Sequence, residues 1–158
     1  MIQRIQTVYL SLAFIAIAVL FAFPLAQFFA EDGTHIFSVT GLKNMVPGEP
    51  NAFNNLIFLP LIIVAVGIGF ISAFSIFQYK NRSFQVKLTN IGVLSSIALI
   101  MGIFFLYIPI IEKKINIVPD YSHAYGIYFP LLSLVFMVLA NRAIKRDEKL
   151  VRSADRLR

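Results

Sequence analysis

The sequence contains no cysteine and no tryptophan, and only 14% of its 158 residues are charged. The missing cysteine excludes disulfide bonds, thiolate metal sites and thiol nucleophiles. The charged fraction lies well below the roughly 25% of an ordinary soluble domain, whereas 58% of the residues are hydrophobic and the mean hydropathy is +0.78. A soluble chain of this length cannot bury so much apolar surface. The composition therefore indicates an integral membrane protein and argues against a soluble enzyme, a disordered chain or an ordinary nucleic-acid-binding domain.

Uncharged apolar runs predict an all-α fold, a polytopic four-helix transmembrane bundle over residues 1–144. The four predicted spans cover about residues 7–30, 55–79, 88–111 and 124–144. Each run reaches the length of about 20 apolar residues that is needed to cross the hydrocarbon core. The first run is longer than a signal-peptide core and lacks a small-residue cleavage site, so it is expected to be retained. Residues 145–158 are expected to continue the fourth helix as a basic amphipathic tail.

The distribution of the 14 Lys and Arg residues predicts the orientation of the bundle. With both termini inside, 11 of these residues lie on the cytoplasmic side and 3 outside, namely Lys43, Lys113 and Lys114. Basic residues are enriched in cytoplasmic connections. Both termini are therefore expected in the cytoplasm.

Small residues at helical spacing predict where helices approach one another closely. The candidate packing residues are Ala18, Ala22 and Ala26 in the first span and Ala65, Gly69 and Ala73 in the second. Packing within the bundle is the simpler interpretation, and a contact with a partner subunit or a second copy is the alternative.

Four prolines fall near the outer ends of the predicted spans, at Pro24, Pro60, Pro109 and Pro130. Proline in a helix removes a backbone hydrogen bond and tends to kink the helix. The outer half is therefore expected to be splayed or irregular, either as a pocket or as the junction between helices and loops. No charged residue lies within the four uncharged runs, the last of which is 121–141. Their lack of charge argues against proton-coupled transport and against an intramembrane hydrolase.

The outer loops carry the remaining candidate chemistry. Alternation of apolar and polar residues at 37–40 indicates a short β-hairpin in these loops, with 115–118 as a second strand. Weak candidates for a metal site are His35, His123, Asp32 and Asp120. They lack a tight ligand spacing, so no metal, no cofactor and no catalytic residue is expected.

Basic residues on the cytoplasmic side are candidates for contact with lipid or a partner. They are Lys80, Arg82, Lys87, Arg142, Lys145, Arg146, Lys149 and Arg152. They serve as a topology anchor, as a site for anionic headgroups or as a docking face. The tail has no aromatic residue to stack on bases, so nucleic acid is not expected as a partner.

The opening MIQRIQT (1–7), the connection YKNR (79–82) and the ending ANRAIKRDEKLVRSADRLR (140–158) resemble a family of Bacteroidota membrane proteins. The family is catalogued as domain of unknown function 4293. The resemblance spans nearly the whole chain and implies a bacterial inner-membrane protein with four helices. It implies no activity, cofactor or site residue.

The sequence thus favours a non-enzymatic inner-membrane protein that acts as a scaffold or accessory subunit of a membrane complex. Its expected partners are anionic lipids at the inner face and a membrane protein or further copies of itself. The alternative is a protein that binds or transports a small molecule or lipid in a cavity of the outer half.

Overall fold

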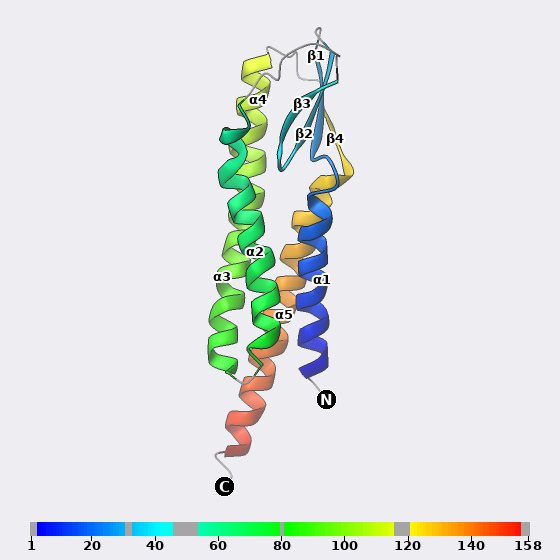
Figure 1. Ribbon diagram of the computed structural model, residues 1–158. Helices are drawn as coiled ribbons and strands as arrows, with labels where there is room; N and C mark the ends of the chain where they lie inside the picture. The colour runs from blue at the N-terminus through cyan, green and yellow to red at the C-terminus, as the bar shows by residue number, and fades with distance from the viewer. Residues whose placement is uncertain (1–2, 31–32, 46–53, 80, 116–120, 156–158) are drawn as a thin grey trace.

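The computed structural model describes residues 3–30, 33–45, 54–79, 81–115 and 121–155 (Figure 1). These residues form a mostly helical fold with a small β-sheet at one end. The long helices are α1 (Gln3–Leu20), α2 (Leu59–Phe77), α3 (Arg82–Met101) and α5 (Tyr128–Asp155). Helix α3 continues through the π-helix η2 (Gly102–Tyr107) into α4 (Ile108–Ile115). The prediction of four long helices is confirmed, but the expected all-α class is incomplete because the structure also contains a four-stranded sheet.

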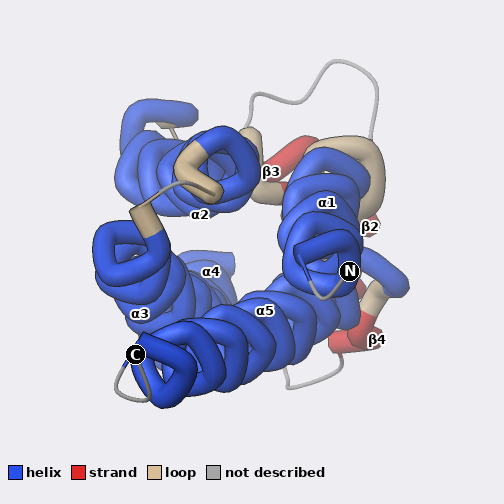
Figure 2. The backbone as a smooth tube through the Cα atoms, turned by 90° about the horizontal axis from the view of Figure 1, so that it is seen from below, coloured by secondary structure: helices blue, strands red, loops and turns tan. Residues whose placement is uncertain are grey.

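The four long helices form a ring in which each packs against two neighbours. Figure 2, a view along the bundle, shows α1, α2, α3 and α5 in that order around the ring. Both ends of the chain lie at the same end of the bundle, which we call the terminal end, and the opposite end is the sheet end (Figure 1).

Three helical stretches are long and apolar enough to span a membrane. They are Leu56–Phe77, Arg82–Ile115 and Tyr125–Val151. The apolar part of α1, Ile5–Leu20, is shorter. This difference arises because the chain leaves the helix early at the sheet end.

The predicted first span, residues 7–30, is wrong after Leu20. Helix α1 ends at Leu20, and strand β1 (Ala26–Ala30) begins after a turn that contains Pro24. Proline has no N–H for a helical hydrogen bond and disfavours helical geometry in the residue before it. An apolar run by itself does not distinguish a buried strand from a buried helix.

Strand β1 is central in a four-stranded antiparallel sheet. The other strands are β2 (Gly33–Ser38), β3 (Gly41–Asn44) and β4 (Tyr121–His123), and the order is β3-β2-β1-β4. The sequence predicted a two-stranded hairpin in the loops, whereas the structure has four strands, one of which comes from the predicted first span. The expected second strand at 115–118 is not seen at Ile115, which ends α4, and its other residues lie outside the described part of the chain.

Aromatic side chains attach the sheet to the helices. Phe37 of β2, Phe58 of the short 3-10 helix η1 (Asn55–Phe58) and Tyr107 of η2 form a cluster with ring centroids 5.6 to 6.3 Å apart. Such ring pairs add to the energy of apolar burial. The Tyr107 hydroxyl also donates a hydrogen bond to the carbonyl of Ile57 at 3.0 Å. The sheet is thus packed on the extensions of α2 and α3.

The four prolines lie at joints of this fold, where helices begin, end or continue from the π-helix. Pro24 lies in the turn after α1, Pro60 is in the first turn of α2, and Pro130 is buried in the first turn of α5. Proline is tolerated in a first turn because the N–H groups there have no helical acceptor. Pro109 is the second residue of α4, which follows the π-helix η2. A π-helix has altered backbone pairing and accommodates a missing donor.

Gly126 marks the closest approach between the start of α5 and the turn after α1. The Gly126 N–H donates to the carbonyl of Pro24 at 2.9 Å, and the Ala124 N–H donates to that of Leu25 at 3.1 Å. A Cβ atom at Gly126 would collide with the backbone carbonyl of Pro24. A side chain at this position therefore requires the sheet and α5 to move apart.

Replacing Gly126 by Ala is expected to lower the thermal midpoint of unfolding, because the collision involves backbone that cannot rotate away. The matched control is Gly67→Ala in the interior of α2, where a Cβ meets nothing within 4 Å. That change should be neutral or stabilising by up to about 1 kcal/mol through helix propensity. Circular dichroism of the detergent-solubilised protein measures both, and equal midpoints for the two variants would contradict the close approach.

Candidate functional site

The terminal end of the bundle gathers the basic residues that the sequence singles out. Arg82 is half-buried, whereas the side chains of Lys87, Arg142, Lys145, Arg146 and Lys149 are exposed. Lys80 and the side chain of Arg152 lie outside the described part of the structure. The structure therefore separates Arg82, which points into the protein, from the cations that face outward.

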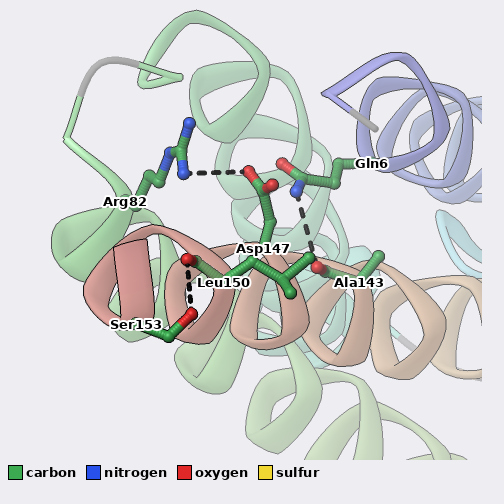
Figure 3. Close-up of polar contacts among 6 residues, drawn as sticks. All are labelled: Gln6, Arg82, Ala143, Asp147, Leu150 and Ser153. Carbon is green, nitrogen blue, oxygen red and sulfur yellow. Dashed lines mark hydrogen bonds and ion pairs between the residues drawn. The ribbon is translucent and has the colours of Figure 1, made fainter. Parts of the chain in front are cut away.

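Arg82 forms an ion pair with Asp147 between α3 and α5. The Nη1 and Oδ2 atoms lie 3.2 Å apart, and the two side chains are 26% and 11% exposed (Figure 3). The contact is electrostatic, since neither atom has a partner that meets hydrogen-bond geometry. A carboxylate this buried is stable only beside a cation. Asp147 thereby fixes the lower part of α5 against α3.

Gln6 of α1 lies beside this ion pair (Figure 3). It is buried, and its Nε2 atom donates to the carbonyl of Ala143 at 3.5 Å. Ala143 lies one helical turn before Asp147, and helical side chains lean toward the N-terminus of their helix. Gln6 and Asp147 therefore point into the same space between the helices, as Figure 3 shows. Three helices meet at this point through polar groups.

A second set of polar contacts lies one level toward the sheet end. The Gln85 amide donates to the carbonyl of Ser75 at 2.9 Å, which joins α3 to α2. The Asn141 amide donates to the Asn90 side chain, which joins α5 to α3. The interior near this end thus contains polar contacts between helices.

A pocket of about 440 Å³ opens between α1 and α5 at the terminal end. Ile5 and Tyr9 line it from α1, and the α5 side is formed by Leu139, Arg142, Ala143 and Arg146. Its walls are mostly apolar, while two guanidinium groups carry positive charge. This combination fits a ligand that has an anionic head and an apolar body. Both arginines are among the contact residues predicted from the sequence. The packing of α5 against α1, which forms the pocket, cannot be inferred from the spacing of residues along one helix.

A second, apolar groove of about 360 Å³ lies between α1 and α2. Its lining contains three small residues and three aromatic side chains. The complete lining is Phe14, Ile17, Ala18, Phe21, Val66, Gly69, Phe70 and Ala73. The groove faces outward between two helices, where it is open to a further helix or to acyl chains.

The predicted packing residues divide between the interior and this groove. Ala65 and Gly69 of α2 are buried, and the α2 backbone at Gly69 lies close to Phe14 and Ile17 of α1. Ala73 is half-buried and Ala18 is exposed, and both line the groove. Ala22 is exposed in the turn after α1, whereas Ala26 is buried in β1 and is no part of a helix face.

The two histidines lie in the sheet. His35 pairs with Phe28 and His123 with Ala26, so both side chains start from the same face of the sheet with β1 between them. His35 is buried, and neither ring nitrogen has a hydrogen-bond partner. Asp32 and Asp120 lie outside the described residues. Within the part of the chain that the structure describes, no three His, Asp or Glu side chains are grouped as metal ligands.

The whole chain matches one protein family. Residues 2–157 match the family described as Domain of unknown function (DUF4293), and the chain belongs to that family. The resemblance read from both ends of the sequence and from residues 79–82 is thereby confirmed. No curated protein matches the chain.

The ion pair between Arg82 and Asp147 is expected to show energetic coupling. Replacing Asp147 by Ala should lower the free energy of unfolding by roughly 1–3 kcal/mol, because Arg82 then loses its partner in a partly buried site. The double variant R82A/D147A should cost less than the sum of the two single changes by at least about 0.5 kcal/mol. Denaturant unfolding in detergent measures all three.

Lys145→Ala is the control for this cycle, because Lys145 is exposed on the same helix. Its effect should stay within about 0.5 kcal/mol. Strict additivity of the Arg82 and Asp147 changes would show that the pair does not hold α5 against α3.

Proposed function

We propose that this member of the family is a non-enzymatic integral membrane protein that acts as a scaffold or accessory subunit of a membrane complex. In this proposal the bundle spans the bacterial inner membrane, both termini are cytoplasmic, and the sheet end faces outward. The three long apolar helices and the basic terminal end support this placement.

The groove between α1 and α2 is the observation that carries the scaffold role. Transmembrane helices associate through small residues that let their backbones approach closely. The α2 backbone at Gly69 packs closely on α1, and Ala18 and Ala73 line the open groove beside this contact. The occupant that fits this groove is a transmembrane helix of another membrane protein, since the surface of such a helix and the groove are both apolar and small residues are among those that line the groove.

The alternative function, a carrier for a small molecule or lipid at the sheet end, has less support. The space near Pro24, Pro60, Pro109 and Pro130 contains the buried face of the sheet. Buried side chains there include Phe28, Phe37, Leu42, Phe58, Ile108 and Ile111. A carrier would need that packing to open.

Purification of a tagged chain in mild detergent is expected to retain a membrane-protein partner at a fixed ratio. Ala73→Leu fills the groove and should release the partner. Gly67→Leu adds bulk to the same helix where nothing lies within 4 Å of a Cβ, so the partner should stay bound. Two differently tagged copies in one cell identify the case in which the partner is a second copy of this chain. A native chain that purifies alone, or a partner retained by Ala73→Leu, would overturn the role assigned to the groove.

Single-cysteine labelling tests the orientation without background, because the native sequence has no cysteine. Thr40 at the turn between β2 and β3 and Ser153 near the end of α5 are both exposed. In spheroplasts, a membrane-impermeant maleimide should label Thr40→Cys at once and Ser153→Cys only after permeabilisation. The reverse pattern would show that the bundle is inserted the other way round.

A further inference from the structure

Arg142 and Arg146 present an uncompensated pair of positive charges on the surface of α5. They lie one helical turn apart, and both are exposed. Within the described residues neither arginine has an ion-pair partner. The nearest acids on α5 turn toward α3, since Asp147 pairs with Arg82 and Glu148 accepts a hydrogen bond from Ser83 at 3.0 Å. Like charges at this spacing repel each other, and an anion placed between them removes that cost.

The pocket that these arginines line also has apolar walls and a tyrosine, which are typical of the interface between lipid headgroups and hydrocarbon. Ile5 and Tyr9 of α1 face Leu139 and Ala143 of α5 across a space of about 440 Å³. Tyrosine is enriched where headgroups meet hydrocarbon, because its ring is apolar and its hydroxyl is polar. A free inorganic anion would leave these apolar walls exposed to water.

The apolar surface continues from the pocket toward the sheet end. On α1, Leu12 follows Ile5 and Tyr9 at helical spacing and is 36% exposed. On α5, Val135 precedes Leu139 by one turn and is 52% exposed. Residues at these spacings share one helix face, so an apolar path leads away from the two arginines. Its course matches an acyl chain whose headgroup lies at the terminal end.

We infer that the pocket between α1 and α5 binds an anionic phospholipid. Arg142 and Arg146 hold the phosphate, for which the planar guanidinium group is well suited. Tyr9 and Leu139 contact the first part of an acyl chain. This inference rests on the proposed function, which places the terminal end at the inner leaflet, and it makes the lipid a specific ligand of the bundle.

The test is native mass spectrometry of the full chain in detergent, with dioleoyl phosphatidylglycerol or dioleoyl phosphatidylcholine added. The native chain should retain phosphatidylglycerol preferentially. R142Q/R146Q should weaken that binding about 30-fold, from the usual contribution of two basic residues at an anionic surface. The control K145Q/K149Q removes the same charge from exposed positions of the same helix that do not line the pocket, and its affinity should stay near the native value.

A third variant and a competitor separate the lipid from a free phosphate. Ala143→Trp fills the pocket but leaves both arginines, so it should reduce retention of phosphatidylglycerol. Glycerol phosphate, which has the headgroup chemistry without acyl chains, should fail to displace the lipid at equal concentration. Circular dichroism and the thermal midpoint of each variant establish that it is folded.

Three results would overturn the inference. They are equal retention of the two lipids, equal loss in R142Q/R146Q and K145Q/K149Q, and complete displacement by glycerol phosphate. Failure here leaves the partner and orientation experiments untouched, because those depend on the α1–α2 groove and on labelling at Thr40 and Ser153. Loss of a protein partner in R142Q/R146Q without any lipid preference would assign the pocket to that partner.

Discussion

Backbone hydrogen bonding is the constraint on which this architecture depends. In an apolar environment every N–H and C=O group needs a partner within the protein, which helices supply internally and open sheets do not. The sheet has two edges, β3 and β4, and it lies at one end of the bundle. There it occupies the space that α1 and α5 would fill if they were as long as the helix from Arg82 to Ile115. In the proposed membrane placement, the four helices therefore lie together in hydrocarbon only up to the level where α1 ends.

The same constraint explains which parts of the fold could be predicted from sequence. The helices were predictable because long uncharged runs have few other solutions in a membrane protein. Strand β1 was not predictable, because the apolar run that ends at Ala30 is compatible with a buried strand as well as with a helix. The contact of Gly126 with Pro24 joins positions about a hundred residues apart, so no local pattern indicates it. The sheet thus had to be seen in three dimensions.

The candidate site was predictable only in its outward part. Exposed cations such as Arg142 and Arg146 follow from the charge pattern of the tail. Asp147 lies in the same charged stretch, and sequence alone does not distinguish it from a solvated residue. Its burial depends on Arg82, 65 positions earlier, and on Gln6 from α1. Helix α5 consequently carries two kinds of charged group at one level: Asp147 and Glu148 contact α3, and Arg142 and Arg146 are exposed.

The unequal helix lengths have a consequence for the surrounding bilayer. Helix α1 has 18 residues, which corresponds to about 27 Å, whereas the continuous helix from Arg82 has 34 residues and about 51 Å. A typical hydrocarbon core is about 30 Å thick. In the proposed placement the side of the bundle formed by α1 is slightly too short for that core, while the α3 side exceeds it. Lipids would have to thin locally beside α1 and not beside α3, so hydrophobic mismatch would make one flank of the protein favour shorter acyl chains.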